Sequence, residues 1–550
     1  MTDSRQRRPP LLVSAPDAVD RGEMNNVRSR SYEKELFEHS PILRSVTRLA
    51  APVVMGQIIL VVYNMVDTFF ITLTGNAAMV AAAGVCMPAF MFISAVSNLF
   101  GIGGAGAISR ALGRGDHERV RQASSFACWG CAALTLCYSL FALLFRDAFV
   151  DLLGGGQDAA VHGFASDYLL VTVALGGLAT AMAALLSHLI RSEGRSLEAS
   201  LGIMLGGVSN IALDPLFMFA LLEPGREVLG AAAATALSNV LSLAYFAAII
   251  LRNRRASSLR FRPERAMLDR PVVRSVLVSG LPACLMTLLE NVSFAVLENL
   301  MSAYTAGGQV FYQAGLSVAK KINMLAHCIV RGMSQGVLPL IGYNYAAKNY
   351  HRMKQAVLYS AAMSVAMAAA CMLISLIFSR PMVGLFNQTG DGLEWGARFL
   401  RILALGGPFS AAAYATISFF QATGKGGRSL FLALLRKGLL DIPIMLLLNP
   451  LIPVCGIVMA TPITDVICSG VAVVIFSRFL KSHGIRFDAR DLETGGKGRR
   501  TPRSRPPDAP ASPPVREDED VFLLRGKADA NDGEDQLITG WLRGFKRDRF

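Results

Sequence analysis

The sequence contains few charged residues. Asp, Glu, Lys and Arg make up only 17% of its 550 residues, and they cluster in short segments between long apolar runs. Hydrophobic residues reach 53%, and the mean hydropathy is +0.43. Soluble globular domains carry about 25% charged residues. The composition therefore excludes an ordinary soluble protein and predicts an all-α polytopic membrane protein.

The sequence also lacks a convincing motif for a metal, a redox centre or a nucleotide. Its nine cysteines lie in or beside apolar segments, and the CxxC formed by Cys128 and Cys131 has no second pair or histidine nearby. Zinc sites need such further ligands, so side-chain packing is the better interpretation. Residues 101–106 match GxGxxG, but they lie in an apolar run without a preceding strand pattern or a following acidic residue at the required distance. Close helix contact explains these glycines better, and we expect no cofactor.

No secretory signal is visible near the start of the sequence. Residues 1–40 are polar and rich in Arg, Ser, Pro and Glu, and we expect them to form a disordered cytoplasmic tail. Residues 483–550 are polar and rich in proline, which predicts a second disordered cytoplasmic tail. The net charge is +14, and its basic residues lie in loops and tails. Anionic lipid head groups are therefore the expected partners, and nucleic acid is not.

Twelve apolar runs are long enough to be transmembrane helices. If the N-terminus is cytoplasmic, the cytoplasmic loops carry 19 Lys and Arg residues and the opposite loops carry 3. This bias places both termini in the cytoplasm and agrees with an even number of spans. We expect a multi-pass protein of the bacterial inner membrane or the plasma membrane. The expected spans are 46–73, 78–108, 123–146, 166–190, 198–221, 230–251, 275–303, 310–340, 355–378, 396–421, 430–452 and 456–480.

The sequence repeats with a period of about 230 residues. The matched segments are Ala51-Pro52 with Leu281-Pro282, Glu193-Gly194 with Thr423-Gly424, Asp214-Pro215-Leu216 with Asn449-Pro450-Leu451, and Gly230 to Thr235 with Gly456 to Thr461. Each half then holds six spans, so both halves enter the membrane from the same side. We expect an N-terminal lobe at 41–251, a basic cytoplasmic connector at 252–274 and a C-terminal lobe at 275–482. Two equal six-helix lobes are typical of a transporter that binds its substrate near mid-membrane.

Four polar residues within the first lobe predict an ion site. Asp67 lies deep in the first span, and Asn210, Asp214 and Thr235 lie in the fifth and sixth spans. At about 1.5 Å per residue, Asp67, Asp214 and Thr235 reach one level, roughly 8–10 Å below the outer boundary. Carboxylates at such a depth cost several kcal/mol unless they are paired or protonated. The cluster predicts a proton site or, because its ligands are all oxygens, a Na⁺ site formed by Asp67, Asn210 and Asp214. A hydrogen-bonded packing cluster is the alternative.

Pro52 lies near the start of the first span, where its missing backbone donor would bend or loosen the helix. We expect this proline to act as a hinge. Ion binding at Asp67 and Asp214 would change the first helix around Pro52 and bias the lobes between outward-facing and inward-facing states.

The sequence resembles the multidrug and toxic-compound extrusion (MATE) transporters. The resemblance rests on the six plus six spans, on Pro and Asp in the first span, on SRALGRG at 109–115 and on NIALDPLF at 210–217, and it covers roughly residues 40–482. It implies a V-shaped, two-lobed transporter that exchanges protons or sodium ions for organic cations. It also implies that the coupling-ion site of the N-terminal lobe is formed by Asp67, Asn210, Asp214 and Thr235.

The second half does not repeat the acidic cluster. Leu297 stands 230 positions after Asp67, and Asn449 replaces Asp214 in the matched segments. Glu290 resembles a glutamate that some members of the family use in the C-terminal lobe. The usual partner acid in the tenth span is missing, which puts such a role in doubt.

The eighth span carries a basic face. Lys320, His327 and Arg331 are spaced so that they share one side of a helix, and Glu290 or Asp441 could neutralise part of their charge. These residues form either a polar cavity wall, suited to an anionic or zwitterionic group, or a set of internal salt bridges that locks the lobe. A proton relay through His327 has only one histidine to support it.

Three classes of function remain open. The leading one is secondary active efflux by alternating access, in which H⁺ or Na⁺ is exchanged for organic, cationic and amphiphilic compounds. The alternative is a flippase for a lipid-linked sugar or peptidoglycan precursor, which the basic face favours and the acidic cluster and the twelve spans oppose. A membrane enzyme such as a prenyl transferase would need carboxylates at a membrane face to hold Mg²⁺. We expect a monomeric transporter with a small-molecule substrate, not an enzyme.

Overall fold

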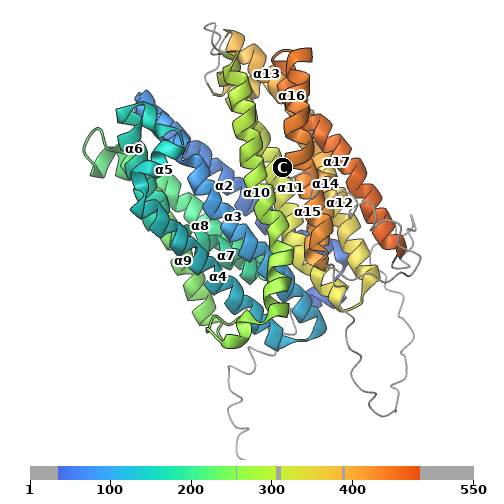
Figure 1. The fold of residues 1–550 in the computed structure, drawn as a ribbon. Helices are drawn as coiled ribbons and strands as arrows, with labels where there is room; N and C mark the ends of the chain where they lie inside the picture. The colour runs from blue at the N-terminus through green and yellow to red at the C-terminus, as the bar shows by residue number, and fades with distance from the viewer. Residues whose placement is uncertain (1–34, 256, 305–310, 387–389, 483–550) are drawn as a thin grey trace, which may run out of the picture. The chain divides into compact units, whose positions relative to one another are not determined.

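The computed structural model describes residues 35–255, 257–304, 311–386 and 390–482. Within these ranges the chain forms helices joined by short turns and contains no strand, which confirms the predicted all-α class (Figure 1). All described helices belong to the compact unit formed by residues 1–497. The predicted tails at 1–40 and 483–550 lie outside the described residues, except for residues 35–40.

Every predicted span coincides with one or more helices. In the first half these are α2 (Ile42–Leu73), α3 (Ala77–Arg114), α4 (His117–Leu144), α5 (Arg146–Leu152), α6 (Ala159–Leu169), α7 (Gly177–Ser192), α8 (Ser196–Pro215) and α9 (Glu227–Arg252). In the second half they are α10 (Arg270–Ser302), α11 (Phe311–Ala346), α12 (Tyr350–Gly384), α13 (Gly390–Ala404), α14 (Gly407–Thr423), α15 (Gly426–Leu434), α16 (Asp441–Leu451) and α17 (Cys455–Ser482). Three π-helical segments, η3 (Leu170–Leu175), η4 (Leu216–Leu221) and η6 (Leu435–Leu440), follow α6, α8 and α15.

The number of membrane spans is close to the prediction. Nine described helices are long and apolar enough to cross a membrane, and the number rises to eleven if the bent pairs α6–α7 and α13–α14 each form one span. The remaining predicted run, 430–452, lies in a continuous helical segment from Gly426 to Leu451. Three charged residues in the middle of this segment, Arg436, Lys437 and Asp441, set it apart from the apolar helices. The twelfth span therefore stays a prediction.

Helix α2 remains helical through Pro52. On either side of this proline, Ala50 and Val54 face Gly336 and Gly332 of α11, and a Cβ on either glycine would meet the α2 backbone. The two glycines are four residues apart, so they lie on one face of α11 and let the helices approach closely. The second half thus contacts α2 where the proline removes a backbone hydrogen bond.

Helices α3 and α10 approach each other in the same way. A Cβ on Gly280 of α10 would overlap the carbonyl group of Leu99, and a Cβ on Gly103 of α3 would overlap that of Val276. Gly103 belongs to the GxGxxG stretch, and Gly280 lies two residues before the second repeated proline, Pro282. Their part in close helix contact is therefore confirmed.

A buried arginine joins the same two helices to α14. Arg110, at the end of α3, donates to the hydroxyl groups of Ser275 and Ser279 of α10 at 2.9 and 3.0 Å. It also donates to the carbonyl groups of Gln421 and Ala422 at 3.2 and 2.9 Å. The guanidinium group thereby satisfies carbonyls at the C-terminal end of α14, which need donors from outside the helix.

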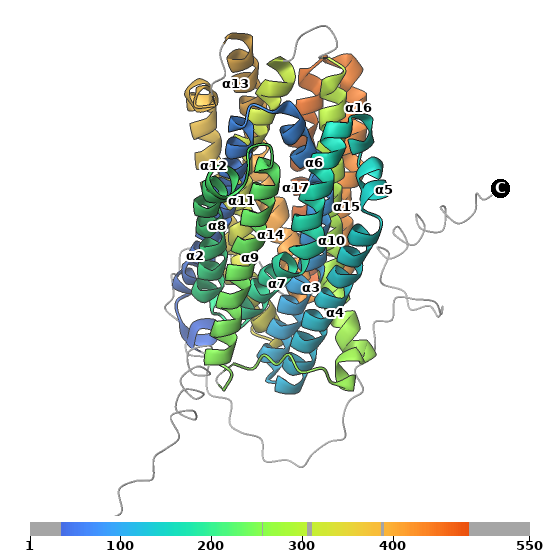
Figure 2. The same cartoon turned by 90° about the vertical axis from the view of Figure 1, so that its left-hand side faces the viewer.

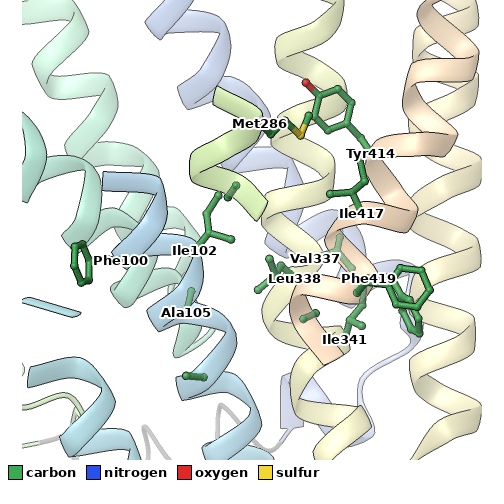
Figure 3. Packing of buried hydrophobic residues seen from close by; sticks show 14 of the residues in the cluster. Phe100, Ile102, Ala105, Met286, Val337, Leu338, Ile341, Tyr414, Ile417 and Phe419 are labelled. Carbon is green, nitrogen blue, oxygen red and sulfur yellow. The ribbon is translucent and has the colours of Figure 1, made fainter. Parts of the chain in front are cut away.

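The hydrophobic core extends across both halves of the chain. Figure 3 shows part of it, in which α3, α10, α11 and α14 contribute the labelled residues Phe100, Ile102, Ala105, Met286, Val337, Leu338, Ile341, Tyr414, Ile417 and Phe419. Because these buried side chains come from both halves, the core does not divide at the connector. The halves share packing as well as a repeated sequence.

The basic connector is attached to the first half. Ser124 and Ser125 of α4 donate to the carbonyl group of Arg260 at 2.7 and 2.9 Å. The buried carboxylate of Glu193, just after α7, accepts a hydrogen bond from the hydroxyl group of Ser257 at 2.9 Å. The predicted linker therefore has fixed contacts.

The last residues of the predicted N-terminal tail are also ordered. Glu35–His39 form a π-helical turn, and the side chains of Leu36 and Phe37 are buried. Arg352 of α12 donates to the carbonyl groups of Leu36, Phe37 and Ser40 at 3.2, 2.5 and 2.7 Å. This turn, which precedes α2, is thus held by the second half of the chain.

We expect Gly280→Ala to destabilise the protein, because the added Cβ cannot fit unless α10 moves away from α3. Overpacking of this kind costs about 1–3 kcal/mol. The loss should appear as a lower Tm of the purified protein in detergent. Gly84→Ala in α3 is the control, since nothing lies within 4 Å of a Cβ at that position. Equal Tm values for the two variants would contradict a stabilising contact between α3 and α10.

Candidate functional site

Three of the predicted polar side chains meet between α8 and α9, which lie side by side (Figure 2). Asn210 donates through Nδ2 to Oδ1 of Asp214 at 3.1 Å and to Oγ1 of Thr235 at 3.2 Å. All three side chains are buried, with exposed fractions of 1%, 0% and 7%. Asn210 and Asp214 are one helical turn apart and share a face of α8. The structure therefore brings together the amide, the carboxylate and the hydroxyl group that the sequence predicts.

Asp67 approaches this group from α2, which packs against α8. Its carboxylate is close enough to that of Asp214 for the two charges to repel each other. Oδ1 of Asp67, Oδ1 of Asn210 and Oδ2 of Asp214 are buried and have no hydrogen-bond partner among the described residues. Buried acceptors without donors are rare and costly. A bound cation or proton would satisfy them.

The chemistry of these groups fits a small monovalent cation or a proton. In the ranges that the structure describes, no three His, Cys, Asp or Glu side chains converge as metal ligands. A Na⁺ ion would be held by the carboxylates of Asp67 and Asp214 together with the carbonyl oxygen of Asn210. A proton would relieve the repulsion between the two carboxylates.

Two tyrosines that the sequence analysis did not include adjoin the site. Tyr63 lies on α2 one turn before Asp67, and Tyr168 lies near the end of α6; both interact electrostatically with Asp67 and Asp214. The spacing of four residues could have revealed Tyr63. No sequence pattern connects Tyr168 with α2, because its position depends on the bent pair α6–α7.

The basic face of α11 is paired with acidic residues of α10. Arg331 lies 3.0 Å from Glu290, and Lys320 lies 2.7 Å from Glu298. The contacts therefore match the interpretation of the face as internal salt bridges. The Arg331 and Glu290 side chains are 34% and 18% exposed, so this pair also borders accessible space. His327 lies within electrostatic range of Glu290.

A second set of ion pairs is fully buried in η6, α16 and α17. Arg436 lies 2.7 Å from Asp465, and Lys437 lies 2.8 Å from Asp441. Arg436 also lies over the ring of Tyr414, 4.5 Å from its centre. Asp441 thus pairs with a neighbour in its own segment and not with the basic face of α11. The sequence analysis missed the other charged residues, although charges inside an apolar run are a sufficient signal.

The hydrogen bonds of Asn449 differ from those of Asp214, with which the sequence repeat matches it. Oδ1 of Asn449 accepts a hydrogen bond from the hydroxyl group of Tyr304 at 2.7 Å. The repeated threonine, Thr461, donates instead to Asp441 at 3.2 Å. The shared Pro-Leu dipeptide suggested the match, whereas in the folded chain the repeated threonine bonds to Asp441 and not to Asn449.

Comparison with known families identifies the fold and the class of protein. The MatE family model matches residues 52–216 and 282–447, which together are more than half of the chain. The chain belongs to the MatE family of transporters. The two matches begin at Pro52 and Pro282, 230 positions apart, in agreement with the predicted period.

Curated MATE relatives cover nearly the same length. The chain is 27% identical over 442 residues to the multidrug export protein MepA of Staphylococcus haemolyticus, covering 80% of this chain and 94% of the relative. It is 28% identical over 464 residues to MepA of Staphylococcus aureus, covering 84% of this chain and 98% of the relative.

Solved MATE structures share the fold. An outward-facing multidrug resistance MATE transporter has a TM-score of 0.73 at 23% identity, covering 82% of this chain and 98% of that structure. A MOP superfamily transporter from Pyrococcus furiosus, described as having a binding pocket of reverse polarity, has a TM-score of 0.72 at 24% identity and covers 83% and 99%. A Vibrio cholerae MATE transporter has a TM-score of 0.73 at 21% identity and covers 83% and 99%. At these identities the likeness establishes the fold alone.

The family assignment confirms the predicted resemblance. MATE proteins are multi-pass membrane transporters and not enzymes, so the class of enzyme considered from the sequence is not supported. The roles of individual residues in this member of the family stay predictions.

We expect Asp465→Asn to destabilise the protein strongly, because it leaves the buried Arg436 without its counter-charge. Breaking a buried ion pair in this way costs about 3–5 kcal/mol. The measurement is the Tm and the yield of monodisperse protein in detergent. The matched control is Glu394→Gln, which breaks the exposed pair with Arg380 and should cost about 1 kcal/mol or less.

The double variant Arg436→Met/Asp465→Leu should recover much of the lost stability, since apolar groups can replace a buried ion pair. A single variant as stable as the Glu394→Gln control would show that the buried pair is not needed to neutralise Arg436.

Proposed function

We propose that this protein is a secondary active efflux transporter that exchanges H⁺ or Na⁺ for organic compounds by alternating access. Its MATE membership supports transport, and the multidrug export proteins among its relatives support efflux of drug-like molecules. The substrates are small organic cations with amphiphilic character. The protein acts as a monomer in the cell membrane, with anionic lipid head groups near its basic loops.

One observation carries this proposal. Asp67, Asn210 and Asp214 place three buried acceptor oxygens without donors in a site where two carboxylates repel each other. Such a site favours binding of a cation or proton and becomes costly when it is empty. The free energy of ion binding can therefore drive a change between two conformations of the protein, provided that the ion binds one of them more tightly than the other.

The contacts between the halves support alternating access. Ala50 and Val54 of α2 touch α11 near the helix ends that adjoin the basic loops, and Gly280 of α10 touches α3 near the same ends. Asp67 lies near the opposite end of α2. We infer that twelve spans form two lobes and that the protein is closed on the side of the basic loops. Separation of the α2–α11 and α3–α10 contacts would open a route for the substrate on that side.

Pro52 fits the role of a hinge in this scheme. It lies between Ala50 and Val54, which carry the contact with α11, and it precedes Asp67 on the same helix. A change in helix geometry at the proline would alter that contact. The ion site and the contact between the halves are thus connected through a single helix.

The second half supplies a polar border of the substrate path. Glu290 and Arg331 are paired and partly exposed, and Lys320 is paired with Glu298. Because these basic side chains already have acidic partners, the face is poorly suited to a pyrophosphate group. The flippase alternative loses its main support. We place His327 in the same border and assign it no role in proton transfer.

The test is transport of a fluorescent cationic dye by proteoliposomes under separate proton and sodium gradients. We expect Asp67→Asn to reduce gradient-driven dye transport at least tenfold, because it removes one of the two charges that the ion neutralises. Its Tm should stay at or above that of the wild type, since a buried charge has been removed. Glu394→Gln, at an exposed site, is the control and should transport normally.

Unchanged gradient-driven transport by Asp67→Asn would contradict the assignment of the ion site. Dependence of the wild type on only one of the two gradients would identify the coupling ion. Tight binding of an isoprenoid pyrophosphate together with absence of dye binding would favour the flippase.

A further inference from the structure

In the second half, α10, α16 and α17 meet at a place that corresponds to the proposed ion site between α2, α8 and α9 in the first half. We call each of these two places a junction. In the first half, Thr235 of α9 accepts a hydrogen bond from Asn210 of α8. In the second half, Thr461 of α17 donates to Asp441 of α16. Both threonines lie five residues after a repeated glycine at the start of the last helix of their half. The repeated threonine therefore marks Asp441 as the counterpart of Asn210.

The residue numbers agree with this correspondence. Pro52 and Pro282 are separated by 230 positions, whereas Asn210 and Asp441 are separated by 231. The extra residue coincides with the π-helical segment η6, which directly precedes Asp441, whereas α8 is regular up to Asp214. A π-helical turn holds more residues than an α-helical turn, so it accommodates the additional position.

The third helix of each junction supplies a hydroxyl group at the repeated position. Ser293 of α10 lies 230 positions after Tyr63 of α2. Ser293 donates to Oδ2 of Asp441 at 2.6 Å, and Tyr63 lies within electrostatic range of Asp214. The two junctions are thus built from corresponding helices and similar groups.

The junctions differ in how the carboxylate is satisfied. In the second half, Lys437 donates to Oδ2 of Asp441 at 2.8 Å, and both side chains are buried, with exposed fractions of 3% and 0%. Both oxygens of Asp441 therefore have donors. In the first half, by contrast, Oδ2 of Asp214 has no partner among the described residues. The second junction already holds a positive charge, whereas no lysine or arginine in the described ranges bonds to Asp214.

The charges around Lys437 are otherwise balanced. Arg436 of its own segment pairs with Asp465 of α17, and Glu290 of α10 pairs with Arg331 of α11. His327 of α11 is the further titratable group within electrostatic range of Lys437. Removal of the Lys437 amine would therefore leave Asp441 as one uncompensated negative charge, surrounded by the hydroxyl groups of Ser293 and Thr461.

We propose that Asp441, Ser293 and Thr461 form a second site for a monovalent cation and that the Lys437 ammonium group occupies it permanently. The inference rests on the proposed function only for the class of ion, H⁺ or Na⁺. The first half then exchanges a free ion, while the second half carries its cation on a side chain. Loss of the amine converts the second junction into a site that takes up one ion from solution.

The test removes the amine in a protein whose first site is disabled. In the Asp67→Asn/Asp214→Asn background, we expect Lys437→Met to raise ion binding from zero to one per chain. Na⁺ is measured with ²²Na⁺ at fixed pH, and H⁺ by titration of the purified protein without Na⁺. The same variant should show a Tm that rises with Na⁺ concentration or with falling pH, because ligands that bind the folded state stabilise it.

The matched control adds Asp441→Asn to Lys437→Met. It recreates the Asn–Thr pair of the first half without charge, so it should fold and bind no ion. If Lys437→Met folds and binds no more ion than its background, the inference is wrong. If Lys437→Met cannot be recovered at high Na⁺ or at low pH while the control can, Asp441 does not recruit an ion, and the inference is also wrong.

Because the first site is disabled throughout, the result is independent of the transport assay. Ion uptake by Lys437→Met would support the second site even if Asp67→Asn left efflux unchanged. Conversely, loss of coupled efflux in Asp67→Asn together with no ion uptake by Lys437→Met would support the proposed function and overturn this inference.

Discussion

The neutralisation of buried carboxylates governs this fold. An acidic side chain in an apolar helix bundle needs a counter-charge, a donor or a proton. The second half meets this need with fixed cations, since Glu290, Asp441 and Asp465 each contact a Lys or Arg. In the first half, Oδ1 of Asp67 and Oδ2 of Asp214 are buried and have no hydrogen-bond partner in the part of the chain that the structure describes. The same architecture thus contains one half whose buried carboxylates contact cationic side chains and one half in which we propose that an ion from solution takes their place.

Close approach of helices supplies the second constraint. Glycines at the α2–α11 and α3–α10 contacts bring backbones together where no side chain would fit. Tight packing of this kind favours discrete arrangements over gradual deformation, because a small shift costs many contacts at once. Pro52 lies within one of these contacts and Asp67 lies further along the same helix. The proposed ion site and the packing between the halves therefore lie on one helix, without a long chain of intermediate residues between them.

Hydropathy and the repeat revealed most of the fold, because apolar runs and repeated prolines are local properties of the sequence. Asn210, Asp214 and Thr235 could be predicted as a site, since residues one turn apart share a helix face and depth can be counted along a span. Tyr168 could not be found, because it lies on α6, far from Asp67 and Asp214 in the sequence, and no sequence pattern connects these helices. The role of Asp441 could not be found, because the shared Pro-Leu dipeptide drew the repeat to Asn449, whereas the repeated threonine bonds to Asp441 in the folded chain. The ordered turn at 35–40 was missed because its anchor, Arg352, lies more than 300 positions away.

That anchor has a consequence for the rate of the conformational change that we propose. Arg352 donates to three carbonyl groups, those of Leu36, Phe37 and Ser40, just before α2, and Asn344 adds a further hydrogen bond to Phe37. Withdrawal of α12 from α2 would have to release these bonds together. Under the proposed alternating access, we therefore expect the segment ahead of the first long helix to slow departure from the state in which these bonds are formed.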